Sequence, residues 1–213
     1  MLFRSTRQLL VRHSSGNCHF GENVPCYAIS NNSKIQVGSK SLDFVWVGKF
    51  ISRKDPLFAL EVARFIVQKR KESKFAFFGG GQLRKKLENR ILGYNLADNV
   101  SIHSWVSKQE ILNQISSANC LLFSSTRETT GNQLLEALNL GTPVIALDAS
   151  GASSWLKSNR IIWKSPKISQ SRINFAKEIA DTYLTNILDA KSPNIEENFS
   201  SEQLLSHLLR DYG

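Results

Sequence analysis

The fold of this chain is decided by residues 44–56, which read FVWVGKFISRKDP. The apolar run at 44–47 consists of valines and aromatic residues, as expected of a buried strand. After a short loop, Asp55 and Pro56 predict the N-cap and first position of a helix that places Leu60 on its apolar face. A strand that leads through a loop into an amphipathic helix is the repeating unit of a parallel sheet covered by helices.

The alternation of strands and helical patterns continues along the chain. Further short apolar strands are expected at 75–78, 100–103, 120–123, 143–147 and 160–163, and two tail helices at 171–188 and 200–211. The sequence therefore predicts an α/β fold with a Rossmann-like parallel sheet flanked by helices. Gly93 and Gly141 are expected to end two of the helices, and Ser107 with Glu110 predicts a capping box at the start of another.

Composition and charge limit the class of protein. With 213 residues, 41% of them hydrophobic, the chain is long enough for one good core, and no apolar run approaches membrane-spanning length, which predicts a cytoplasmic protein. Three cysteines without a close pair argue against a disulfide framework, and no metal is expected. The net charge of +9 leaves open a peripheral contact with an anionic membrane at its inner face, or simply solvated helix surfaces. No aromatic-interleaved basic motif supports nucleic-acid binding.

Polar and glycine residues follow several of the predicted strands. In an open α/β sheet, ligands bind beyond the carboxyl ends of the strands, and this edge receives the residues at 48–49, 79–81, 105, 124–128 and 148–151. Glycines, cations and a carboxylate on one edge suit a phosphorylated ligand that is rich in hydroxyl groups. The glycines at 79–81 lack the acidic partner of a dinucleotide fingerprint, so NAD binding is disfavoured.

Two lysines and two glutamates are the candidate chemical groups at this edge. Lys49 and Lys54 can neutralise a diphosphate, or they are solvated loop residues. A helix that begins near residues 129–131 would offer free amides and its positive dipole end to a phosphate, with Gly131 allowing close approach. Glu128 would lie at the mouth of this helix and Glu136 two turns along it, or both are surface acids.

The order of these landmarks resembles the C-terminal, donor-binding domain of retaining glycosyltransferases with the GT-B fold, glycosyl transferases group 1 or family 4-like. The similarity covers about residues 42–165. It includes the run at 44–49 with Lys54, the glycines at 79–81, Trp105, and the two glutamates separated by seven residues ahead of Gly-Thr-Pro-Val at 141–144.

The resemblance implies a role for each of these residues. Lys49 and Lys54 would bind the nucleotide diphosphate and assist its departure, Glu128 would hold sugar hydroxyls, and these three are the expected catalytic residues. Glu136 would accept hydrogen bonds from the ribose. The remaining donor-binding residues would be Gly48, Gly80, Gly81, Trp105, Val106, Thr129, Thr130 and Gly131. The nucleotide sugar is the substrate, and no cofactor or metal is expected.

Several positions depart from the family pattern. Lys49 stands where arginine is usual, Thr129 and Thr130 replace a usual Gly-Phe pair beside the sugar, and Asp55 takes the place of a glycine. The capping role expected of Asp55 is an adequate structural reason for that residue. The departures leave the identity of the donor sugar open.

The resemblance also implies a domain organisation. Residues 1–40 would be the end of an acceptor domain plus a linker, 41–190 the nucleotide-sugar-binding domain, and 191–213 a C-terminal helix returning across the interdomain cleft. The expected function is transfer of a sugar from a UDP or GDP sugar to a glycan or lipid-linked acceptor, as in polysaccharide biosynthesis, together with an acceptor domain that a separate chain could carry. The alternative is a catalytically inactive domain that binds nucleotide sugars or a partner.

Overall fold

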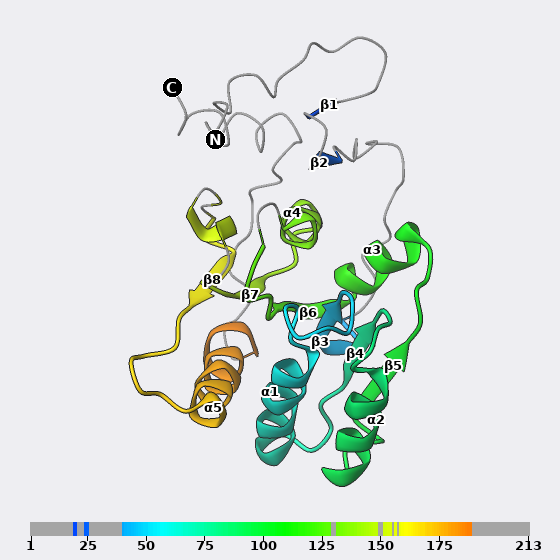
Figure 1. Cartoon of the computed structure of the whole chain (residues 1–213), viewed down its shortest axis with the longest axis vertical. Helices are drawn as coiled ribbons and strands as arrows, with labels where there is room; N and C mark the ends of the chain where they lie inside the picture. Colours follow the sequence, from blue (N-terminus) through cyan, green and yellow to red (C-terminus); the bar gives the residue numbers. More distant parts are fainter. Residues whose placement is uncertain are drawn as a thin grey trace. The chain divides into compact units, whose positions relative to one another are not determined.

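The computed structural model describes residues 19–20, 24–25, 40–128, 131–148, 151–154, 156 and 158–188 (Figure 1). The chain divides into two units, Met1–Lys34 and Ile35–Gly213. In the first unit, strand β1 (His19–Phe20) pairs antiparallel with strand β2 (Val24–Pro25). The helix expected at the C-terminus and most of residues 1–40 lie outside the described residues, so the roles of these segments stay predictions.

The second unit contains a six-stranded sheet in the order β5-β4-β3-β6-β7-β8, and every neighbouring pair is parallel. The strands are β3 (Leu42–Val47), β4 (Phe75–Phe78), β5 (Val100–His103), β6 (Ala118–Phe123), β7 (Val144–Leu147) and β8 (Ile161–Lys164). The predicted Rossmann-like class is confirmed. The strand order reverses between β3 and β6, so the crevice in which such sheets bind ligands opens beyond the carboxyl ends of these two strands.

Helices cover both faces of this sheet (Figure 1). They are α1 (Pro56–Lys69), α2 (Arg84–Gly93), α3 (Lys108–Ser116), α4 (Asn132–Asn139) and α5 (Arg172–Tyr183), with a short 3₁₀ helix, η2 (Gly151–Ser154), and a π-helical segment, η3 (Leu184–Leu188). Helices α1, α2 and α5 pack on one face, and α3 and α4 pack on the other. Within the described ranges, no helix is long and apolar enough to cross a membrane.

The core has one hydrophobic cluster on each face of the sheet. Phe44 and Trp46 of β3 point into the cluster beneath α1 and α5, whereas Val45 between them points to the cluster beneath α3 and α4. This is the two-residue alternation of a strand, and because both faces are covered, the strand reads as a continuous apolar run. Rings of Phe58 and Phe175, with centroids 5.4 Å apart, join α1 to α5.

The helix boundaries follow the predicted signals with one correction. Asp55 caps α1 by accepting a hydrogen bond from the Phe58 amide at 3.2 Å, as expected. Ser107 caps α3, but the Glu110 carboxylate accepts from the Gln114 side chain, so it does not complete the expected capping box in this way. Gly93 is the last residue of α2, as expected, and the left-handed residue Asn95, with φ of 54°, follows two positions later.

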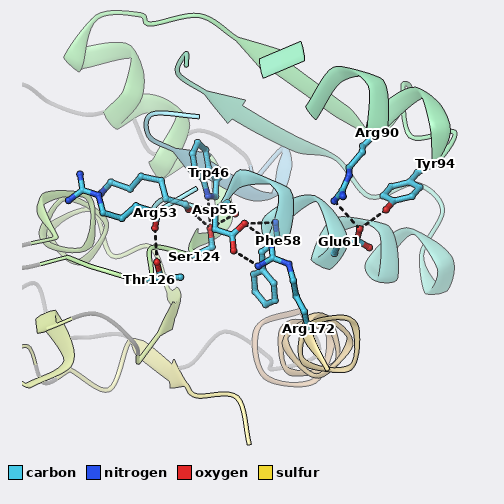
Figure 2. A network of polar contacts seen from close by, with 11 residues as sticks. Trp46, Arg53, Asp55, Phe58, Glu61, Arg90, Tyr94, Ser124, Thr126 and Arg172 are labelled. Atoms are coloured by element: carbon cyan, nitrogen blue, oxygen red, sulfur yellow. Dashed lines mark hydrogen bonds and ion pairs between the residues drawn. The ribbon is translucent and has the colours of Figure 1, made fainter. Parts of the chain in front are cut away.

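A buried carboxylate joins α1 to α2. Glu61, which is 7% exposed, accepts a hydrogen bond of 2.5 Å from the Tyr94 hydroxyl (Figure 2). It also accepts one of 3.0 Å from Arg64. Arg90 of α2 adds an ion pair at 3.6 Å. A buried charge is tolerated only when it is paired in this way. The cluster joins α1 to the C-terminal end of α2.

Glycines at 79 and 81 allow the loops after β3 and β4 to lie against each other. Gly79 has φ of 144°, and a Cβ on it would lie 1.9 Å from the carbonyl oxygen of Gly48. Gly81 has φ of 149°, and its Cβ would lie 2.7 Å from the carbonyl oxygen of Phe50. These glycines therefore set the close approach of two loops at the ligand-binding edge.

We predict that Gly79→Ala lowers the free energy of unfolding by at least about 2 kcal/mol, because the new Cβ meets backbone and the backbone dihedral is unfavourable. Urea unfolding followed by circular dichroism measures the change. Gly93→Ala is the matched control, since nothing lies within 4 Å of its Cβ position. We expect the control to change stability by less than about 1 kcal/mol, in the stabilising direction. Equal losses in the two variants would contradict the close approach.

Candidate functional site

The buried Ser124 hydroxyl joins the end of β6 to the loop between β3 and α1. It accepts a hydrogen bond of 2.9 Å from Trp46 Nε1, and it lies 2.8 Å and 3.0 Å from the carbonyl oxygens of Lys54 and Asp55, to which it donates (Figure 2). Next to it, the Thr126 amide donates to the Arg53 carbonyl at 2.9 Å. The two loops at the point where the strand order reverses are thus held in one fixed arrangement.

Lys54 and Glu128 form an ion pair at this edge. Their side chains are only 14% and 18% exposed, and Lys54 Nζ lies 5.5 Å from the centroid of the Phe123 ring. The sequence predicted that both residues would reach this edge, and the structure brings the ammonium and carboxylate groups into contact. Such a sheltered pair of opposite charges can meet the phosphate and the hydroxyl groups of one ligand.

Lys49 behaves differently from Lys54. Lys49 is exposed on the loop after β3, and it takes part in none of the ion pairs between described residues. The structure therefore does not place Lys49 in the charged pair with Glu128. A role for Lys49 at the diphosphate stays a prediction from the sequence.

Glu136 is the buried acid of α4, with 8% of the residue exposed. It forms an ion pair with Lys108, the first residue of α3, whose side chain is 47% exposed. Burial raises the pKa of the Glu136 carboxyl group, and the bond to Lys108 opposes that rise only in part. A carboxylate whose partner is a half-exposed lysine can exchange that partner for ligand hydroxyls.

Helix α4 begins beside this acid. Its N-cap is Gly131, with φ of 66°, and a Cβ there would lie 2.8 Å from the Leu134 side chain, so backbone and packing both favour glycine. The close approach of a phosphate expected at Gly131 stays a prediction. Thr129 and Thr130 lie outside the described residues. Their expected contacts with phosphate and sugar therefore stay predictions.

An exposed aromatic surface lies at the ends of β4 and β5. Trp105 and Val106 are 57% and 39% exposed, and a Cβ on Gly80 would lie 3.6 Å from Trp105 Nε1. The indole therefore lies beside the glycine loop. Gly48 is also packed, since its Cβ would lie 3.1 Å from the Trp46 ring. An indole next to bare backbone is a suitable surface for a flat ring, which is the role the sequence predicted for this region.

Sequence reasoning placed Ser124 at this edge without a role, and it missed two residues of the site, Lys108 and Arg172. Lys108 and Arg172 contact Glu136 and Asp55, respectively, from other helices. No local motif marks such contacts. A signal was available for Lys108, because α3 and α4 flank β6 in the chain and right-handed crossovers place successive helices of that half on one face.

The fold defines a class of protein, an open α/β domain with charged side chains at the switch point of its sheet. Comparison with known families gives its membership. The model of the glycosyl transferases group 1 family matches residues 30–184, and this chain belongs to that family.

Individual relatives agree with this assignment. The poly(ribitol-phosphate) alpha-N-acetylglucosaminyltransferase of Staphylococcus aureus is 28% identical over 200 residues, covering 88% of this chain and 39% of the relative. The pneumococcal O-GlcNAc transferase GtfA, solved with UDP and GlcNAc, superimposes with a TM-score of 0.62 at 20% identity, covering 83% of this chain and 36% of that one. The predicted resemblance to GT-B glycosyltransferases is confirmed.

One solved structure corresponds to a single domain. The C-terminal domain of a group 1 glycosyl transferase from Francisella tularensis has a TM-score of 0.54 and 19% identity, covering 65% of this chain and 74% of that one. At such identity the likeness shows the fold alone. The chain spans between 26% and 42% of the length of the curated relatives it matches.

We predict that Glu136→Gln becomes more favourable for stability as the pH rises. The raised pKa means that the folded chain binds the Glu136 proton more tightly than the unfolded chain does. Wild-type stability therefore falls as the pH rises from the pKa of Glu136 in the unfolded chain through its pKa in the folded chain. The stability difference, variant minus wild type, should therefore be larger at pH 7 than at pH 4 in urea unfolding. A difference that is flat or falls with pH would contradict the dominant effect of burial.

Proposed function

We propose that this chain is the donor-binding part of a glycosyltransferase that transfers a sugar from a nucleotide-diphosphate sugar to a glycan or lipid-linked acceptor. The observation that carries the proposal is the Lys54–Glu128 ion pair at the switch point of the sheet. Family membership and the presence of UDP in the pneumococcal structure support a nucleotide-sugar donor.

The proposed chemistry uses the two charges of this pair on adjacent groups of the donor. Sugar hydroxyls lie next to the glycosidic phosphate in such donors, so Glu128 can accept from the hydroxyls while Lys54 contacts the diphosphate. When the bond between the anomeric carbon and the phosphate oxygen breaks, the electron pair stays with the departing diphosphate, and Lys54 stabilises that charge. The acceptor hydroxyl oxygen forms the new bond to the anomeric carbon, and its proton passes to the departing diphosphate. The resemblance implies retention of configuration at the anomeric carbon.

Glu136 is proposed to bind the ribose of the same donor. Its carboxylate can accept hydrogen bonds from two neighbouring hydroxyls, which would take the place of the Lys108 ammonium. The exposed Trp105 beside Gly80 is proposed to border the base. Together these residues would extend the site from the sugar at α4 to the base near β5.

The acceptor side is proposed to come from a second domain, because the matched relatives are much longer than this chain. That domain could belong to the same protein or to a separate chain. The net charge of +9 is compatible with peripheral contact with an anionic membrane at the cytoplasmic face, where lipid-linked acceptors for polysaccharide biosynthesis would be met.

Calorimetric titration of the full 213-residue chain with UDP, GDP and their glucose and N-acetylglucosamine derivatives tests the proposal. We expect one nucleotide diphosphate to bind, and its sugar derivative to release free nucleotide when an acceptor domain is supplied. Binding without turnover in the presence of that domain would favour the inactive binding module. Lack of binding by every nucleotide would contradict the proposed site.

We predict that Glu136→Ala weakens nucleotide-diphosphate binding by about 1–3 kcal/mol, through lost hydrogen bonds to the ribose. Glu128→Ala should leave binding of the nucleotide diphosphate nearly unchanged and weaken binding of the sugar derivative. Calorimetry with both ligands separates the two effects. Glu88→Ala, which removes a half-exposed acid on α2, is the control and should change neither affinity. Equal effects of the two site variants on binding of the free nucleotide diphosphate would contradict the separate roles of Glu136 at the ribose and Glu128 at the sugar.

A further inference from the structure

The residue after Lys54 has an unusual backbone. Asp55 has φ of 54° and ψ of 57°, a left-handed conformation that glycine adopts readily and most other residues do not. The residue is only 7% exposed, and its amide donates to the carbonyl oxygen of Ile51 at 3.1 Å. The carbonyl oxygens of Lys54 and Asp55 both face the Ser124 hydroxyl. Any movement of Asp55 therefore moves the backbone of Lys54.

The Asp55 side chain is held from a distant helix. Arg172, the first residue of α5, donates from both Nη atoms to both carboxylate oxygens at 2.5 Å (Figure 2). The guanidinium carbon also lies 5.2 Å from the centroid of the Phe58 ring. A two-point contact between a planar guanidinium and a carboxylate fixes direction as well as distance. The carboxylate is thereby locked while it also caps α1.

Helix α5 has other contacts with α1 that do not involve this carboxylate. The Phe58 and Phe175 rings pack together, and Lys69 forms an ion pair with Asp181 at 2.6 Å towards the other end of the two helices. The side chain of Arg172 is 52% exposed, so it contributes little to the buried interface. What Arg172 adds to these packing contacts is a fixed position for the turn at Lys54.

We propose that Arg172 is a positioning residue for the donor site, which acts through Asp55 to hold the Lys54 ammonium where the diphosphate binds. The inference rests on the proposed function, because it assigns Lys54 to the diphosphate. It extends that function by making α5, which contributes no side chain to the Lys54–Glu128 pair, part of the machinery that orders the site. The lysine itself pairs with Glu128, so its backbone and its ammonium are held from opposite sides of the loop.

The test compares ligands with and without the second phosphate. In the full chain, Arg172→Met should weaken UDP binding about five- to tenfold, because a less ordered Lys54 loses part of its contact with the second phosphate, and leave UMP binding unchanged. Asp55→Gly keeps the left-handed turn available but removes the carboxylate, and should show the same selective loss. GDP and GMP are measured in parallel in case the site takes guanine.

Double variants show whether the effect passes through the proposed residues. In a Lys54→Met background, Arg172→Met should cause no further loss of UDP affinity, and the same holds in an Asp55→Gly background. Lys69→Met, which removes the exposed ion pair between the same two helices, is the matched control and should leave both ligands unaffected.

Each outcome discriminates between the inference and the function on which it rests. Equal weakening of UDP and UMP by Arg172→Met, or a full additional loss in the Lys54→Met background, would overturn the positioning role and leave donor binding intact. An unchanged UDP affinity in Arg172→Met and Asp55→Gly would do the same. Failure of the wild-type chain to bind UDP or GDP would overturn the proposed function itself.

Discussion

The site depends on one buried hydroxyl. Ser124, which is 1% exposed, connects the indole of Trp46 in the core to the carbonyl oxygens at Lys54 and Asp55. Buried polar groups cost free energy unless they are paired, and this arrangement pairs all of these groups. The loop that carries the lysine is consequently fixed relative to the sheet, and the charged pair with Glu128 follows from it.

The two acids of the site are each held by a lysine from another segment. Lys54 reaches Glu128 across the β3–β6 junction, and Lys108 reaches Glu136 from α3 to α4. Burial disfavours the ionised form of Glu136, so the neighbouring cation matters for its charge. A donor that brings phosphate to the lysine and hydroxyls to the acids would replace these internal contacts with equivalent ones, which limits the cost of binding.

Local patterns predicted most of the strands and helix starts because they depend on neighbouring residues. The run at 44–47 lies in β3, because a strand buried on both faces requires consecutive apolar residues. Asp55 caps α1, because a free amide at a helix start favours a side chain that accepts a hydrogen bond. Gly93 ends α2, as the local pattern predicted, and Asn95 supplies the left-handed turn after it. The glycines at 79–81 were predicted correctly to end a strand. What requires glycine at 79 and 81 is the close approach of the backbone at Gly48 and Phe50, which depends on the tertiary structure.

The sequence by itself determined the parallel α/β fold and the edge of the sheet that receives Lys54 and Glu128, because chain order and strand ends follow from local periodicity. The family followed from the resemblance of its ordered motifs. Only the tertiary structure decided which charges meet. Asp55 and Arg172 are 117 residues apart, and Lys108 and Glu136 lie on different helices. Such contacts depend on strand order and on helix packing across the sheet, and no short-range pattern in the chain encodes those distances.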